Sequence, residues 1–302
     1  MFTKTVSRTS DVCIFRNEKF LIGCLDECGT RLIIRMNLPF HKFQGTGNDF
    51  VLVDQRSDHH LTRADTERIR HLCDRRFGVG ADGLILLQLT EGYDFEMVYF
   101  NADGRESTLC GNGGRCTVQL AHQLGLFDQN CRFLAIDGAH DARRMDEPNW
   151  IALKMNDVTE VQATEDHFVL DTGSPHFVTF VEDLRDLNIR ESGALIRYSA
   201  PFKQEGINVN FVENRDGTLH VGTYERGVED ETLSCGTGVT AAAIAYARQV
   251  GLTGRQITVP IQTKGGRLQI RLTATKAGAT DIWLCGPAVK VFDGCLTLFD
   301  VV

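Results

Sequence analysis

LCGNGGRC (Leu109–Cys116) and SCGTGVTA (Ser234–Ala241) carry one pattern: a cysteine, a glycine, a polar residue, a second glycine, and then a run that predicts a helix. The two glycines let the backbone turn tightly and approach a ligand closely. One such turn would say little about the fold. Two of them in a chain of 302 residues suggest that larger segments repeat as well.

The flanking segments do repeat, in the same order and at nearly one offset. In each copy a strand and an acidic turn precede the cysteine turn. A helical run closing on Gly-Leu, which is a C-cap signal, follows it, and further strands come after. The matched segments are 47–54 with 173–183, 77–87 with 205–213, and 99–113 with 223–238. We therefore predict two copies of one domain.

The repeat sets the predicted domain limits. We expect an N-terminal domain over 37–160 and a C-terminal domain over 161–282, with one cysteine turn in each. A last strand over 283–302 is expected to return to the first domain. Because each copy has many strands and few helices, the predicted fold class is α+β with a mostly antiparallel sheet.

Residues 1–36 form an extension before the repeat. Two interpretations stay open: the true start is Met36, or the extension adds a pair of strands. Its segment "CIFRNEKFLIGCLDECGT" lacks the unbroken apolar stretch and the cleavage site of a signal peptide.

Composition narrows the classes of function. The chain is 42% hydrophobic and 24% charged, with a net charge of −8, so it is typical of a globular protein and does not indicate a nucleic-acid partner. No apolar run in the sequence approaches the roughly 18–20 residues of a membrane helix. Ten cysteines without a secretion signal predict reduced thiols in the cytoplasm.

Two local patterns resemble a metal site and a nucleotide-binding loop, but their surroundings do not support either. Cys24 and Cys28 are four apart, but no second pair lies nearby, so structural thiols are favoured over zinc and no metal is expected. GVGADG (78–83) fits a dinucleotide loop formally. It follows a helical run and opens a strand, which is the reverse of the order that such a loop needs.

The paired cysteine turns indicate acid–base chemistry. The free N–H groups at a helix start stabilise a thiolate, so we expect Cys110 and Cys235 to have lowered thiol pKa values. Two copies facing each other would place one thiol on each side of a substrate. One thiolate would then remove a proton from a stereocentre and the other thiol would return one to the opposite face. No cofactor signature is present, so the carbanion would depend on N–H groups in a closed cleft.

Two other interpretations of the cysteines stay open. Both could be small buried residues that cap helices, or they could form a redox disulfide. The repetition of the whole turn favours the proton-transfer hypothesis over either.

Other polar residues lie on the matched turns. Asn48, Asn101, Asn112 and Asn208 predict a polar pocket, against ordinary turn chemistry. Glu225 and Arg226 interrupt a strand. They form either a surface ion pair or a site in which Arg226 holds a carboxylate and Glu225 meets an ammonium group. His176 is either a plain turn residue or a group that orients or polarises a thiol.

These residues resemble the diaminopimelate epimerase family over about Pro39 to Leu298. The specific stretches are KFQGTGNDFVLVD, FGVGADGLILL, FNADGRESTLCGNGGRC, TYERGVEDETLSCGTG and CGPAVKVFDG. The resemblance implies a cytoplasmic, cofactor-independent isomerase that converts LL-diaminopimelate to meso-diaminopimelate, for lysine and peptidoglycan precursors. It implies two similar domains, each a sheet wrapped round a central helix, in a homodimer.

The resemblance also implies roles for single residues. Cys110 and Cys235 would be the acid–base pair, and His176 and Glu225 would tune their thiols. The implied substrate contacts are Asn48, Asn101, Gly111, Asn112, Asn208, Glu225, Arg226, Gly236 and Thr237.

This chain departs from the family pattern at three places. Ser174 stands where many members have Asn and keeps one hydroxyl for a substrate contact. Gly83 stands where some have Gln, and Phe292 where some have Tyr near the dimer contact. A related racemase or isomerase of the proline racemase kind remains the alternative function, and a non-enzymatic scaffold is the hypothesis from another class.

Overall fold

The computed structural model describes residues 11–16, 19–24 and 31–301, and the side chains of residues 36–298. The chain divides into two units. One holds the described residues up to His41 and from Phe292 onward, and the other is Lys42–Val291. The zinc alternative at Cys24 and Cys28 lies outside the described residues and side chains.

The first unit is a set of antiparallel strands. Strand β1 (Asp11–Arg16) pairs with β2 (Lys19–Cys24), and β2 pairs with β3 (Arg31–Gly45). Strand β3 also pairs with β19 (Val289–Val301). Within this unit the ring of Phe292 meets Phe40 edge-on, with ring centroids 6.0 Å apart.

The second unit contains two lobes, and the N-terminal lobe follows one chain of strand pairs. From the first strand to the sixth, successive neighbours pair in parallel, antiparallel, parallel, antiparallel and antiparallel sense. The strands are β4 (Asn48–Asp54), β5 (Gly83–Gln88), β6 (Glu96–Asn101), β7 (Asn130–Ala135), β8 (Gly138–Arg144) and β9 (Trp150–Lys154).

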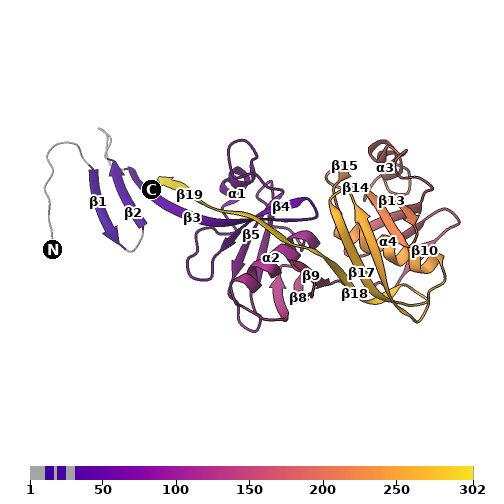
Figure 1. Ribbon diagram of the computed structural model, residues 1–302. Helices are drawn as coiled ribbons and strands as arrows, with labels where there is room; N and C mark the ends of the chain where they lie inside the picture. The colour runs from indigo at the N-terminus through magenta and orange to yellow at the C-terminus, as the bar shows by residue number, and fades with distance from the viewer. Residues whose placement is uncertain (1–10, 17–18, 25–30, 302) are drawn as a thin grey trace. The chain divides into compact units, whose positions relative to one another are not determined.

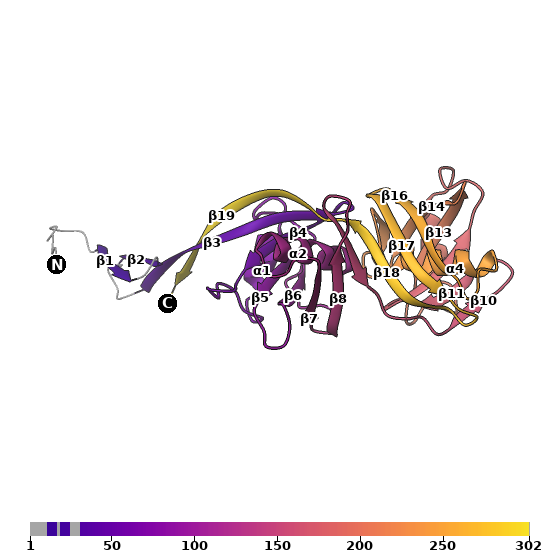
Figure 2. The same ribbon diagram turned by 60° about the horizontal axis from the view of Figure 1, so that its bottom comes forward.

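The C-terminal lobe repeats that order and sense of pairing. Its corresponding strands are β12 (Pro175–Phe180), β13 (Asn208–Arg215), β14 (Thr218–Glu225), β16 (Gln256–Thr263), β17 (Gly266–Ala274) and β18 (Ala279–Pro287). Figure 2 shows β16, β17 and β18 side by side. Short strands β10 (Val161–Ala163), β11 (Phe168–Asp171) and β15 (Asp230–Thr232) are added to the lobe.

The described residues form four helices, at matching places in the two lobes. They are α1 (Thr66–Cys73), α2 (Gly111–Gln123), α3 (Ile189–Arg197) and α4 (Gly236–Gln249). Helix α2 packs on β8 and β9, and α4 packs on β13, β14 and β17 (Figure 1). Most residues of both helices are buried, as expected for a helix that is covered on every side.

The ends of α2 and α4 agree with the sequence pattern. Gly125 and Gly251 take positive φ angles of 75° and 69° just after the helices. The N–H of the following leucine bonds back to the carbonyl five residues earlier in each case, which is the Schellman arrangement. The helix α3 was not expected. Its Asn188 cap accepts a hydrogen bond from Glu191 N, so the local signal was present in the sequence.

Each lobe has its own apolar core. Phe50, Ile85 and Phe133 belong to the core round α2, and Val212, Ile244 and Ile270 to the core round α4. Strands β9 and β18 pair antiparallel, with Leu153 opposite Leu284, so the two sheets are joined. The α+β class is confirmed. The predicted last strand over 283–302 is divided between β18 and β19, and the domain limits themselves stay a prediction.

Candidate active site

The two cysteines occupy equivalent positions. Cys110 is the N-cap of α2 and Cys235 is the N-cap of α4, both with extended backbone angles. Gly238 N donates to the Cys235 sulfur at 3.4 Å, so this thiol caps its helix in place of the usual hydroxyl or carboxylate. Both residues are free thiols.

The starts of the two helices meet at their first residues. A Cβ atom added to Gly111 would lie 4.0 Å from the Gly236 Cα, and the same addition to Gly236 would lie 3.8 Å from the Gly111 Cα. Either Cβ would also lie 2.9 Å from the same methyl group of Leu284. Glycine at both positions allows this approach, which brings the two cysteine turns to one place.

One buried amide links the two turns. The Asn112 nitrogen donates to Asn48 Oδ1 and to the Ser234 carbonyl, both at 3.2 Å. Ser234 directly precedes Cys235, and Asn48 Oδ1 also accepts from the Cys110 thiol at 3.5 Å. Asn48 and Asn112 therefore lie at the cysteines, as the polar-pocket hypothesis requires.

Burial dominates the electrostatics of both thiols. It raises the pKa of Cys110 above the ordinary value, although the N–H groups of Gly113 and Asn112 oppose it. Burial, followed by the charge of Glu225, raises the pKa of Cys235 to about 12, against the hydroxyl of Thr237 and the Gly238 N–H. The expected lowering of the thiol pKa values is therefore wrong, because desolvation outweighs the helix start.

Glu225 acts on both cysteines. It ends β14, and burial raises the pKa of its carboxyl group. Its negative charge disfavours ionisation of Cys110 as well as Cys235. Arg226 does not form the alternative surface pair with it. The exposed Arg226 guanidinium donates to the Glu205 carbonyl at 3.0 Å instead.

Asn208 joins the Arg226 turn to the Ser174 turn. Its nitrogen donates to Ser174 Oγ at 2.8 Å and to the Pro175 carbonyl at 3.0 Å, and its oxygen accepts from Arg226 N. Ser174 thus takes part in an internal hydrogen bond. The Thr172 hydroxyl donates to the carbonyl of Thr237, which ties the same turn to the start of α4.

His176 is fully buried and neutral. Burial, with the charge of Arg226 second, lowers its pKa to about 3. Its Nδ1 accepts from the Asn210 amide at 3.0 Å, and its buried Nε2 has no hydrogen-bond partner among the described residues. Asn210 is not among the site residues predicted from the sequence. The alternation in INVNF could have revealed it, because Asn208 and Asn210 share one face of β13.

An ion network that the sequence did not predict holds the Asn48 turn. The Asn48 nitrogen donates to Asp82 at 2.7 Å, and Arg75 bridges Asp49 and Asp82. Burial alone would raise the pKa of Asp49, but hydrogen bonds from Arg75 and Lys42 bring it well below its usual range. These groups come from four separate segments, so no single motif reveals them.

Tyr99 explains the glycine at position 83. A Cβ on Gly83 would lie 2.6 Å from the Phe100 carbonyl oxygen and 2.7 Å from a ring carbon of Tyr99. The Tyr99 hydroxyl donates to Asn101 Oδ1 at 2.8 Å. Tyr99 therefore fills the space that a glutamine would need, and it holds the exposed side chain of Asn101.

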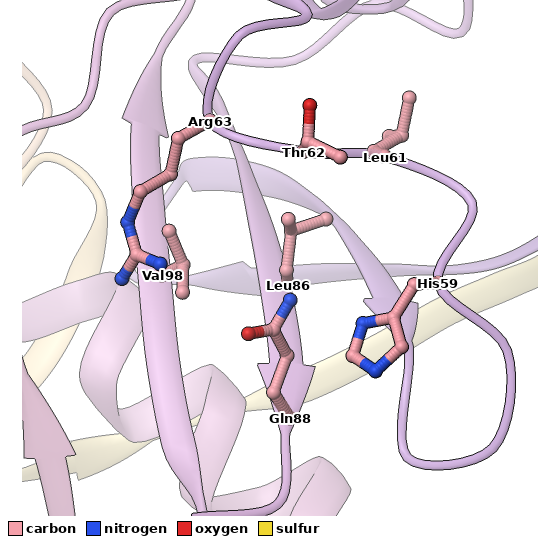
Figure 3. A pocket seen from close by; sticks show the side chains of 7 residues that line it. All are labelled: His59, Leu61, Thr62, Arg63, Leu86, Gln88 and Val98. Carbon is pink, nitrogen blue, oxygen red and sulfur yellow. The ribbon is translucent and has the colours of Figure 1, made fainter.

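A separate hollow of about 310 Å³ lies on the N-terminal lobe between β5, β6 and the loop before α1 (Figure 3). His59, Thr62, Arg63 and Gln88 supply its polar lining, and Arg63 is paired with Glu96 and Glu106. It includes none of the predicted site residues.

Within the residues that the structure describes, no group of three His, Cys, Asp or Glu side chains is placed to hold a metal ion. No helix in the described part of the chain has the length and apolar character needed to span a membrane.

Comparison with known proteins decides the family. The model of the diaminopimelate epimerase family matches residues 40–160 and 168–291. The chain belongs to the diaminopimelate epimerase family. It is 46% identical over 257 residues to a diaminopimelate epimerase from Flavobacterium psychrophilum, covering 85% of this chain and 99% of that one. A diaminopimelate epimerase from Chlorobaculum tepidum is 40% identical over 263 residues, covering 84% of this chain and 99% of that one.

Solved structures agree on the fold of the family. A phenazine biosynthesis protein of the PhzF family from Bacillus anthracis has a TM-score of 0.70 at 15% identity, covering 87% of this chain and 100% of that one. A hydroxyproline epimerase from Agrobacterium vitis has a TM-score of 0.61 at 15% identity, covering 87% of this chain and 93% of that one. The predicted diaminopimelate epimerase family and isomerase class are confirmed, while the roles of single residues stay predictions.

Proposed function

We propose that this protein interconverts LL- and meso-diaminopimelate by moving a proton between two cysteines, without pyridoxal phosphate. The observation that carries the proposal is the meeting of two cysteine-capped helix starts at Gly111 and Gly236. The identity of 34–46% to proteins named diaminopimelate epimerase supports the choice of substrate.

The reaction needs one thiolate and one thiol. The thiolate takes the α-proton and becomes a thiol, while the electron pair of the broken C–H bond stays on the substrate. The opposite thiol then gives its proton to the other face and becomes the thiolate. Cys110 and Cys235 exchange these roles when the reaction runs backward.

The helix starts are placed to stabilise the carbanion. Their backbone N–H groups and positive ends favour a carboxylate, on which the negative charge is delocalised. The proposed contacts are the backbone turns at Gly111–Asn112 and Gly236–Thr237. A thiol with a raised pKa gives a more basic thiolate, which suits removal of a weakly acidic carbon-bound proton.

The polar residues round the cysteines have proposed roles as well. Asn48, Asn101, Asn208 and Ser174 would help to hold the amino-acid groups of the substrate, and Arg226 would hold a carboxylate. Glu225 would meet an ammonium group and, with His176, tune the thiols. We further propose that the enzyme is a cytoplasmic homodimer that serves lysine and peptidoglycan precursor synthesis.

Deuterium incorporation tests this function. The protein is incubated with LL-diaminopimelate in heavy water without pyridoxal phosphate, and α-deuteration and meso product are followed by NMR. Parent protein should form deuterated meso product, and Cys110→Ala and Cys235→Ala should each lose epimerisation.

The same assay with proline and hydroxyproline separates the alternative. Turnover of these amino acids, with no exchange on diaminopimelate by reduced parent protein, would replace the proposed substrate by a proline racemase-like one.

A further inference from the structure

Arg115 is a fully buried arginine in the second turn of α2, directly behind the Cys110 turn. Its guanidinium makes no ion pair with a carboxylate in the part of the chain that the structure describes. Its Nε atom is buried without a hydrogen-bond partner among the same residues. A buried charge of this kind is costly, and an arginine cannot escape the cost by losing its proton at physiological pH.

The surroundings are shaped to hold this side chain. Arg115 Nη2 donates to Asn112 Oδ1 at 2.9 Å and to Thr46 Oγ1 at 3.4 Å. A Cβ on Gly45 would lie 3.3 Å from Nη2, and one on Gly286 would lie 3.3 Å from Nε. Glycines from two other strands therefore make the space that the guanidinium fills.

The contact with Asn112 reaches both cysteine turns. Arg115 engages the oxygen of Asn112, which leaves the nitrogen directed at Asn48 and at the Ser234 carbonyl. The guanidinium, together with the Thr46 hydroxyl that also donates to Asn112 Oδ1 at 3.4 Å, thus fixes the orientation of this bridging amide.

The charge of Arg115 acts on thiols. Its positive charge favours the ionised forms of Cys110, Cys116 and Cys285. Cys116 and Cys285 are fully buried, whereas Cys110 is partly exposed at the start of the helix. Cys110 is therefore the member of the set that can exchange a proton with a substrate.

We propose that Arg115 is a positioning residue for the cysteine reaction, fixing the Asn112 bridge and offsetting the negative charge when Cys110 loses its proton. The proposal rests on the proposed function for its catalytic consequence, but its effect on Cys110 needs no substrate.

Alkylation of Cys110 is the direct test. Iodoacetamide labelling at Cys110 is followed by peptide mass spectrometry from pH 7 to 11, in a Cys235→Ala background. Arg115→Gln should slow labelling at pH 8 by about tenfold, which corresponds to roughly one unit of thiol pKa. The control is Arg105→Gln, which removes the same charge from an exposed side chain in the turn before Cys110. If folded Arg115→Gln shares the pH profile of that control, the charge role is overturned.

Arg115→Lys separates the effect of the positive charge from that of the guanidinium contacts. It also provides a test of the proposal if Arg115→Gln does not fold. Lysine keeps the positive charge but lacks the planar guanidinium, whose Nη2 donates to Asn112 and Thr46 and whose Nη1 donates to the Gly111 carbonyl. The labelling profile of Cys110 should therefore stay near that of the parent background. In the otherwise unchanged protein, kcat should fall at least tenfold. A shifted profile or an unchanged kcat would overturn the proposal. Inactive parent protein would instead count against the proposed function and leave the labelling result valid.

Discussion

At the scale of the residue, the two thiols share a helix position but differ in their neighbours. Cys110 donates to the side chain of Asn48, whereas Cys235 lies 3.4 Å from the Thr237 hydroxyl and from Gly238 N. The charge of Glu225 disfavours ionisation of both. Glu225 is therefore a residue whose replacement is expected to change the pKa values of both thiols together.

Replacing Glu225 by Gln should speed alkylation of both cysteines. Loss of the negative charge lowers both thiol pKa values, so we expect about threefold to tenfold faster labelling at pH 8, or roughly half to one pKa unit. Epimerisation should fall, because the proposed ammonium partner is gone. As the pH drops through the raised pKa of Glu225, its carboxyl becomes neutral and the two proteins should converge.

The exposed Glu205 provides the control for this experiment, since Glu205→Gln removes an equal charge on a nearby turn. Equal labelling rates for Glu225→Gln, Glu205→Gln and the parent would contradict the assigned action of Glu225. The readout is again the labelled fraction of each cysteine peptide, which distinguishes the two thiols.

The sequence predicted which residues lie near the two cysteines better than it predicted their hydrogen-bond partners. Cys110, Cys235, Asn48 and Asn112 do lie together. Their contacts depend on segments that are distant in the chain, such as Asn112 with the Ser234 carbonyl. The error in the thiol pKa has the same origin, because a local motif describes the helix start but not the amount of protein packed over it.

At the scale of the element, the starts of α2 and α4 are the features that the sequence predicted most directly. Cysteine, glycine and the closing Gly-Leu each have a local physical reason, so the helix ends could be placed without knowing the tertiary structure. The contact between the two starts could not be placed in this way. It depends on Leu284, which follows both cysteine turns in the chain and packs under both glycines.

Gly236→Ala should reduce activity by at least tenfold while α4 itself remains formed. The added Cβ would lie 2.9 Å from the Leu284 methyl group, so the Leu284 side chain must shift and the packing at the two helix starts must change. Such overpacking costs about 1–3 kcal/mol of stability. Activity assays and thermal unfolding of the variant measure the two effects.

Shortening Leu284 tests whether its methyl group is the cause of the activity loss in Gly236→Ala. The pair Gly236→Ala with Leu284→Ala should recover part of the activity relative to Gly236→Ala, because the methyl group that the Cβ meets is removed. Leu284→Ala alone is the control. If the double variant is no more active than the product of the two single effects predicts, the contact with Leu284 is not the reason for the loss.

At the scale of the whole molecule, the two lobes bring two oxidisable groups together. Each lobe supplies one thiol, and the ionised form of Cys110 raises the pKa of Cys235, so the two groups lie within electrostatic reach of each other. The repeat predicted this pairing of lobes, and the order of strand pairing agrees with it in every corresponding step.

Air oxidation should therefore join Cys110 to Cys235 and stop activity, and dithiothreitol should restore it. Mass spectrometry of the unreduced digest would detect the cross-linked peptides, while the Cys110→Ala variant should not form them. Air-treated protein that retains two free thiols and full activity would show that the sulfur atoms do not face each other.

Leu284 also sets a limit on how this chain can change over evolutionary time. The two lobes have the symmetry of a pair of like halves, yet the residue between their glycines comes from one half alone. A substitution at position 284 changes the packing at both cysteine turns at once, so the sequences of the two lobes cannot change independently at this contact. If the two lobes were encoded as separate chains, the chains would not be equivalent, because only one of them would supply the leucine that packs against both glycines.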